Sequence, residues 1–114
     1  MKVAIIGGDG TNPAHFKALD KEFDELITNS GRYLFTVIGG FCGVMEPPFP
    51  LSYIWAQERG LPYSVKQYQN IGKIIQGICI EADYVIFLND GSELIDRFIK
   101  AYKNTGKHGS VINI

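Results

Sequence analysis

Apolar residues occur along this chain in two alternating patterns. Short continuous apolar runs, typical of buried strands, are separated by segments whose apolar positions recur at helical spacing. The predicted strands span residues 2–7, 33–40, 62–68, 84–89 and 110–114. The predicted helices span residues 13–30, 51–60, 70–82 and 92–106. The pattern therefore predicts strand and helix in alternation along the chain.

The predicted strands are mostly apolar on both faces, which is typical of a parallel sheet covered by helices on each side. Right-handed crossovers leave few possible topologies for such a chain. We predict one α/β domain over residues 1–114, with a doubly wound, Rossmann-like, five-stranded parallel sheet in the order 3-2-1-4-5. Ligands of such sheets bind outside the carboxyl ends of the strands, beside the point where the winding direction changes.

The segment 13–30 carries the clearest helix signals. Asn12 can cap its first turn, Pro13 takes the favoured first helical position, and Gly31 can end it. Its apolar face consists of Phe16, Leu19, Phe23, Leu26 and Ile27. In the segment 92–106, the residues expected to point inward are Leu94, Ile95, Phe98, Ala101 and Tyr102. Both segments are expected to pack one face against the sheet.

Composition and charge exclude only a few broad classes of function. The formal net charge is −1 and the lysines and arginines are scattered, so nothing favours binding to nucleic acid or to a membrane surface. The first apolar run ends at Gly7, too early for a secretory signal, and no run is long enough for a spanning helix. A cytoplasmic location is therefore predicted.

The two cysteines, Cys42 and Cys79, lie far apart without CxxC spacing, so neither a disulfide framework nor a zinc site is predicted. Cys42 could be a reactive thiol if it lay at a helix start. No histidine is near it in the sequence, and a small packing residue is the preferred interpretation. Cys79 is interpreted as a core residue. No metal and no cofactor are predicted.

Three predicted strands run into glycine-rich stretches: GGDGT (7–11), GGFCG (39–43) and NDGSE (89–93). The first is neither a dinucleotide fingerprint nor a P-loop. It is either a tight strand-to-helix turn or a cradle for a phosphate or carboxylate at a helix start, since glycine allows close approach to the backbone. The second stretch has the same two interpretations. The candidate ligand-binding residues are Gly7, Gly8, Asp9, Gly10 and Thr11 in the first stretch and Gly39, Gly40 and Gly43 in the second.

The third stretch brings carboxylates to the same predicted edge of the sheet. One interpretation is structural: Ser92 caps the next helix, and Glu93 complements the helix dipole. The other is functional: Asp90 binds a ribose, or Glu93 acts as a nucleophile or base. The candidates are therefore Asn89, Asp90, Gly91 and Ser92 for binding and Glu93 and Asp90 for catalysis. Asn70 and Lys73, which open another predicted helix, are further binding candidates.

Four stretches in this order, VIGGFCGV, SYIWAQERGLPYSV, ADYVIFLNDGS and the final VINI, resemble the small bacterial and phage Rossmann-like domains of the SLOG superfamily. The nearest branch is the YspA-like one, and the resemblance runs over essentially the whole chain. WAQERGLP (55–62) and ADYVIFLNDGS (82–92) are the most similar stretches. Relatives include the cytokinin-activating phosphoribohydrolases and the DNA-processing protein DprA. The resemblance implies a pocket for a nucleotide or nucleotide derivative, carried here by Gly7, Gly8, Asp9, Gly39, Gly40, Gly43, Asp90, Gly91 and Ser92.

Three functions remain open at this point. The first is a cytoplasmic domain that binds a nucleotide-derived ligand at the glycine-rich loops. The second is an enzyme of the phosphoribohydrolase or deoxyribosyltransferase type that acts on an N-glycosidic bond through Glu93 or Asp90. The third is a phage or bacterial protein-interaction module that uses the proline-rich stretch 45–55. A homodimer is also expected, with Tyr53, Trp55 or neighbouring aromatic residues in the interface.

Overall fold

A computed structural model of the chain describes residues 1–8, 10–31, 34–42, 50–68 and 71–114. For residues 40–42, 65–68, 71, 72, 75 and 79 it describes the backbone alone. The strands are β1 (Lys2–Gly7), β2 (Thr36–Cys42), β3 (Tyr63–Tyr68), β4 (Tyr84–Asn89) and β5 (Gly109–Asn113). The helices are α1 (Pro13–Ser30), α2 (Leu51–Glu58), α3 (Ile71–Glu81) and α4 (Glu93–Lys103).

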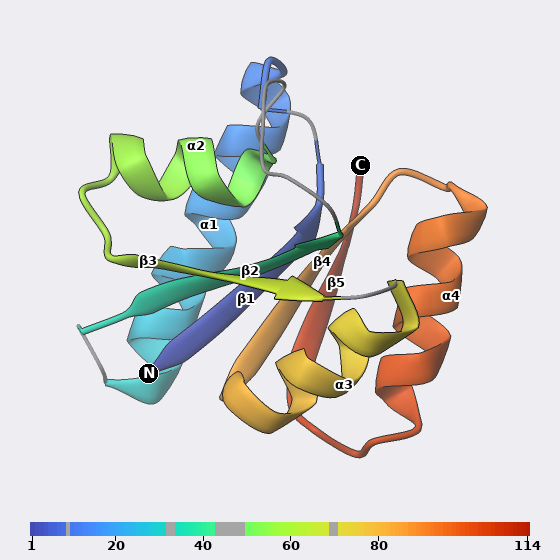
Figure 1. Cartoon of the computed structure of the whole chain (residues 1–114). Helices are drawn as coiled ribbons and strands as arrows, with labels where there is room; N and C mark the ends of the chain where they lie inside the picture. The colour runs from blue at the N-terminus through green and yellow to red at the C-terminus, as the bar shows by residue number, and fades with distance from the viewer. Residues whose placement is uncertain (9, 32–33, 43–49, 69–70) are drawn as a thin grey trace.

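The five strands form one parallel sheet in the order β3-β2-β1-β4-β5 (Figure 1). The predicted doubly wound α/β fold of the Rossmann-like type is therefore confirmed. The two central strands are in register from Val3 opposite Tyr84 to Gly7 opposite Leu88. Val3 and its neighbour Ala4 point to opposite faces of β1, and both are fully buried. Burial on both faces explains why the central strands are continuously apolar.

Helices cover both faces of the sheet. Figure 1 shows α1 and α2 together on one face and α3 and α4 together on the other. Each face has its own core cluster. The first cluster includes Val3, Ile5, Leu19, Phe23, Trp55 and Leu88, and the second includes Ala4, Ile38, Ile78, Phe87, Phe98 and Ile99.

Helix α1 begins and ends where the sequence predicts. The Asn12 side chain accepts a hydrogen bond from the Ala14 N–H at 3.0 Å, and Pro13 is the first helical residue. Gly31 ends the helix at φ +67°, and its N–H donates to the Ile27 carbonyl at 2.9 Å. The predicted apolar face is confirmed: Leu19, Phe23 and Leu26 are buried, and Phe16 and Ile27 pack against them.

Strand β2 differs from the sequence-based expectation at its carboxyl end. It continues through Cys42, two residues beyond the predicted end at residue 40, so Gly39 and Gly40 lie inside the strand rather than at the start of a glycine-rich loop. They are in register with Val65 and Lys66 of β3, and this ladder keeps both glycines extended. The pattern that resembles a strand ending in glycine is therefore misleading here.

The inward face of α4 also differs from the expected set. Ile95, Phe98 and Tyr102 are buried as predicted, but Leu94 is 45% exposed and Ala101 is also exposed. Ile99 is buried instead. The buried residues are Ile95 and those three, four and seven positions after it, which is the ordinary spacing of one face of a helix.

Candidate functional site

The candidate site lies at the centre of the sheet, where β1 and β4 are neighbours. α1 follows β1 onto one face, whereas α4 follows β4 onto the other (Figure 1). Because these connections leave in opposite directions, their loops border a crevice at the carboxyl edge. Gly7, the last residue of β1, is in register with Leu88, which brings residues 10–12 and 89–92 to the same edge.

The start of α1 contributes two polar side chains to this crevice. Asn12 Nδ2 lies 3.3 Å from Nε2 of His15, one turn further along the sequence. No acidic residue occurs in the first turn of α1, so its electrostatics favour an anion. His15 is not among the site residues predicted from the sequence, because nothing in its sequence context connects it with the loop after β4.

The loop after β4 is held by its own side chains. Asn89 Oδ1 accepts from the Gly91 N–H at 3.0 Å, and Asn89 Nδ2 donates to Asn113 Oδ1 at 3.1 Å. Asp90 Oδ1 accepts from the Ser92 N–H at 2.8 Å. Gly91 takes φ +83° in open space, so the turn needs glycine for its conformation and not for packing.

Asp90 is an exposed, ionised carboxylate in this loop. The hydrogen bond from the Ser92 N–H, then that from the Ser92 side chain, holds the pKa of the Asp90 carboxyl below its ordinary value. The imidazole of His15 lowers the pKa of Asp90 as well, and this is the weakest of the influences. His15 of α1 is thus a minor electrostatic influence on Asp90 of the β4 loop.

Ser92 caps α4, which gives a first prediction. Its Oγ accepts from the Ile95 N–H at 3.3 Å, as the structural interpretation of this serine predicts. Ser92→Ala should lower the free energy of unfolding by about 0.5–2 kcal/mol, because the first turn loses its cap. Ser92→Asp restores an acceptor at the cap position and should recover most of that loss. Denaturant titration of both variants checks this, and equal stability of Ser92→Ala and the wild type would contradict it.

Several predicted ligand glycines have a packing role. A Cβ on Gly8 would collide with the side chains of Leu51 and Leu88, and one on Gly10 would lie 2.5 Å from Cδ1 of Ile54. A Cβ on Gly39 would collide with the Tyr63 hydroxyl. These glycines therefore let α2 and β3 pack closely against neighbouring backbone.

The structure brings only some of the predicted residues together. Nine of them end or follow β1 or β4 at the centre of the carboxyl edge: Gly7, Gly8, Gly10, Thr11, Asn89, Asp90, Gly91, Ser92 and Glu93. Lys73 is exposed in the first turn of α3, which begins at the same edge. Gly39 and Gly40 are inside β2. Asp9, Gly43 and Asn70 lie outside the described residues.

Glu93 has the surroundings of an ordinary surface carboxylate. Its side chain is 86% exposed, and Oε1 lies 3.9 Å from Nε of Arg97, one turn later. With Asp96, it supplies the acidic first turn of α4. This negative charge already complements the α4 dipole, so α4 offers less attraction to an anion than α1 does.

Among the described residues, a small cavity lies near the crevice. It has a volume of about 110 Å³, lies beneath the carboxyl ends of β1 and β2, and has Ser52 as a polar residue in a mostly apolar described lining. Ligand pockets for small molecules are usually about 300–1,000 Å³. This cavity by itself is therefore smaller than those that usually hold small-molecule ligands.

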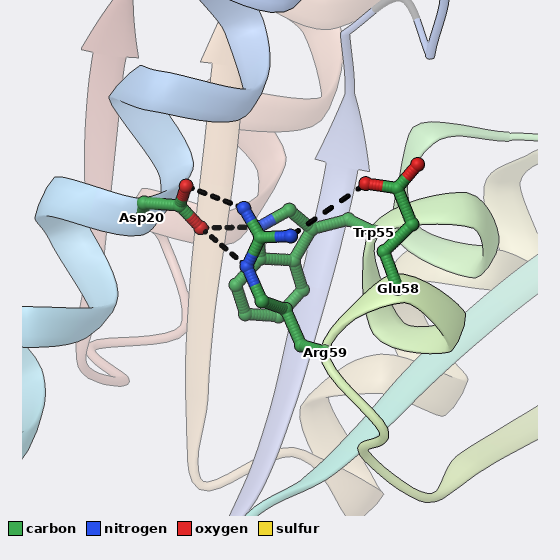
Figure 2. Close-up of polar contacts among 4 residues, drawn as sticks. All are labelled: Asp20, Trp55, Glu58 and Arg59. Atoms are coloured by element: carbon green, nitrogen blue, oxygen red, sulfur yellow. Dashed lines mark hydrogen bonds and ion pairs between the residues drawn. The ribbon is translucent and has the colours of Figure 1, made fainter.

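A larger hollow of about 400 Å³ lies away from this edge, between α1 and α2, and Figure 2 shows the polar cluster beside it. Trp55 Nε1 and Arg59 Nε each donate to Asp20 Oδ1 at 2.9 Å. The Arg59 guanidinium also pairs with the second oxygen of Asp20 and lies 5.7 Å from the Trp55 ring centroid. Trp55 and Arg59 of WAQERGLP thus join α2 to α1.

Trp55 is 2% exposed within one copy of the chain, so its ring presents almost no surface to a partner. The expected homodimer itself stays a prediction. The Trp55 ring is enclosed within one copy of the chain, where its centroid lies 4.4 Å from that of Phe23. Tyr53, the other residue named for that interface, is half-buried and packs edge-on against Tyr63.

No protein-family model matches the sequence, and no curated protein sequence is significantly similar to it. Within the described residues, no group of three or more histidine, cysteine, aspartate or glutamate side chains is placed to hold a metal ion. None of the helices in the described part of the chain is long and apolar enough to cross a membrane.

Proposed function

We propose that the protein binds a nucleotide or nucleotide-derived ligand at the carboxyl edge of the sheet, between the start of α1 and the loop Asn89–Ser92. The observation that carries this proposal is that the start of α1 and the loop after β4 meet at the carboxyl edge, at the point where the winding of the sheet reverses. The resemblance of the sequence to the SLOG superfamily supports the same class of ligand.

The two sides of the crevice suit different parts of a nucleotide. The positive end of the α1 dipole and the His15 ring favour a phosphate group. Asp90 accepts hydrogen bonds and is exposed, which suits the hydroxyl groups of a ribose. A phosphate beside α1 and a sugar beside Asp90 would satisfy both sides.

Binding is better supported than catalysis. An N-glycosidic enzyme would use Glu93 or Asp90, but Glu93 is an exposed partner of Arg97. Asp90 accepts from the Ser92 N–H, and its lowered pKa is unsuited to a general acid. The interaction-module alternative uses the proline-rich stretch 45–55, of which residues 45–49 lie outside the described residues.

Calorimetric titration with AMP, adenosine and inorganic phosphate tests the proposal. His15→Gln should weaken binding of AMP and phosphate by roughly tenfold and leave adenosine unchanged, because the neutral amide of glutamine cannot carry the positive charge that an imidazole can bring to a phosphate. Asp90→Ala should weaken AMP and adenosine by a similar factor and leave phosphate unchanged. His108→Gln is the matched control, because this second histidine precedes β5 at the opposite edge of the sheet.

Two outcomes would contradict the proposal. One is wild-type protein that binds none of the four common ribonucleoside monophosphates in calorimetry. The other is AMP binding that His108→Gln weakens as much as His15→Gln does. Release of free base from any of these nucleotides, lost in Glu93→Gln, would instead favour the enzyme.

A further inference from the structure

Strand β5 is an open edge of the sheet. It pairs with β4 on one side, and within the described residues no strand pairs with it on the other. Natural edge strands usually carry charges, prolines or bulges that prevent pairing with another chain. β5, with the sequence GSVIN, has no charge and no proline. Gly109, Val111 and Asn113 are all exposed.

The hydrogen bonds to β4 show which backbone groups of β5 face outward. The Val85 N–H donates to the His108 carbonyl at 3.3 Å, and the Ile114 N–H donates to the Asn89 carbonyl at 2.9 Å. Backbone groups alternate in direction along a strand, so even-numbered residues of β5 face β4. Gly109, Val111 and Asn113 therefore direct their N–H and carbonyl groups away from the sheet.

We propose that two copies of this chain pair through β5, antiparallel, about a twofold axis at Val111, so that the two sheets become one. The three outward residues are spaced evenly around Val111. Gly109 of one copy would face Asn113 of the other, and the two Val111 residues would face each other. Each facing pair can exchange two backbone hydrogen bonds, as in an ordinary antiparallel ladder.

The side chains along this edge fit the arrangement. Val111 is 38% exposed and borders a hollow of about 80 Å³ with Ile99 and Lys103 of α4. Pairing would cover Val111 with its counterpart, and burial of this apolar surface would add to the hydrogen bonds. Ile114, just after β5, is 39% exposed and lies along the same edge.

Charges on α4 favour a second copy as the partner. Asp96 and Lys103 are seven residues apart, so they lie on the same side of the helix, on either side of Ile99. Within one copy, Asp96 also pairs with Lys100 of the same helix at 2.9 Å. Because Ile99 borders Val111, the twofold axis passes near the middle of this stretch. The two α4 helices would run antiparallel, with Asp96 of each copy opposite Lys103 of the other.

Opposite charges also lie beside the other face of β5. Lys21, Glu22 and Glu25 of α1 lie beside Val111 and Ile112, and Lys21 and Glu25 are one turn apart. Antiparallel α1 helices would bring Lys21 of one copy toward Glu25 of the other. The charged residues beside β5 would thus be related by one twofold axis, so that positive groups of one copy lie opposite negative groups of the other. Binding of an unrelated partner would not require this symmetric arrangement.

Sedimentation velocity over the micromolar range tests this pairing. The wild type should dimerise, and Val111→Pro should raise the dimer dissociation constant by roughly tenfold or more, because it removes the central outward N–H groups. The N–H of Val111 does not pair with β4, so the fold of each copy should persist. Val111→Thr keeps the N–H and the branched shape and should still dimerise. A monomeric wild type, or Val111→Pro that dimerises like the wild type, would overturn the proposal.

A charge exchange keeps the test decisive if Val111→Pro does not fold. Asp96→Lys and Lys103→Asp should each weaken the dimer, because each places like charges opposite one another. The double variant should recover the dimer, since the pairs are restored with their signs exchanged. If the single variants acted only by destabilising α4, their effects would add in the double variant and the dimer would not recover. A double variant that dimerises more weakly than either single one contradicts the pairing. Neither outcome depends on nucleotide binding at the other site.

Discussion

Replacement of Gly7 by alanine is expected to lower the free energy of unfolding by about 2–5 kcal/mol, the sum of backbone strain and overpacking. Gly7 has φ +90°, which side chains of L-residues rarely adopt. A Cβ there would also lie 2.6 Å from the carbonyl oxygen of Leu88 and 3.1 Å from Cδ1 of Ile95. The carbonyl belongs to the adjacent central strand β4, so it cannot retreat without disturbing the sheet.

Gly91→Ala is the matched control for this variant. Gly91 has a similar φ of +83°, but nothing lies within 4 Å of the position of its Cβ. It should therefore lose only the conformational part, about 1–2 kcal/mol. Denaturant unfolding of the two variants separates strain from collision. Equal destabilisation at the two positions would show that Gly7 is required only for its backbone conformation.

Trp55→Ala is expected to cost about 3–5 kcal/mol of unfolding free energy, as for other large aromatic residues in cores. Trp55 is 2% exposed and packs against Phe23 beneath the join between α1 and α2. The variant leaves a cavity and removes the Nε1 donor to Asp20. Trp55→Phe keeps most of the ring and should recover more than half of the loss. Thermal and denaturant unfolding measure both.

Asp20→Asn provides the electrostatic counterpart of Trp55→Ala. Burial raises the pKa of Asp20, but hydrogen bonds from Arg59 and Trp55 outweigh it and hold this pKa below its ordinary value. Its contribution to stability is therefore present above the unfolded-state pKa and is lost as pH falls through the folded-state value. Because the Asp20 side chain is 39% exposed, solvent screening limits the ion pair to at most about 1 kcal/mol. A greater loss in Asp20→Asn than in Trp55→Ala would contradict this ranking.

The fold could be predicted from the sequence to a large extent. Central strands buried on both faces require continuous apolar runs, and Val3 to Ile5 and Val85 to Leu88 show such runs. The ends of α1 were predictable because Asn12, Pro13 and Gly31 act on their immediate neighbours. The right-handedness of crossover connections between parallel strands then restricted the possible strand orders.

The candidate site was predictable only in part. The carboxyl edge and Asp90 follow from strand order and from a carboxylate placed after β4. His15 was missed because its connection with Asp90 spans 75 residues of sequence, the difference between positions 90 and 15, and is made by the sheet. Gly39 was misplaced because pairing with β3 extends β2 beyond it.

The sequence by itself determined the α/β class, the strand order and the local ends of α1, because these depend on apolar periodicity, chirality and neighbouring residues. Only the tertiary structure decided what the glycines and WAQERGLP do. Gly8 accommodates Leu51 and Leu88, while Trp55 and Arg59 bind Asp20. The physical reason is that a close contact depends on which distant side chain the fold brings near, and no local pattern contains that information.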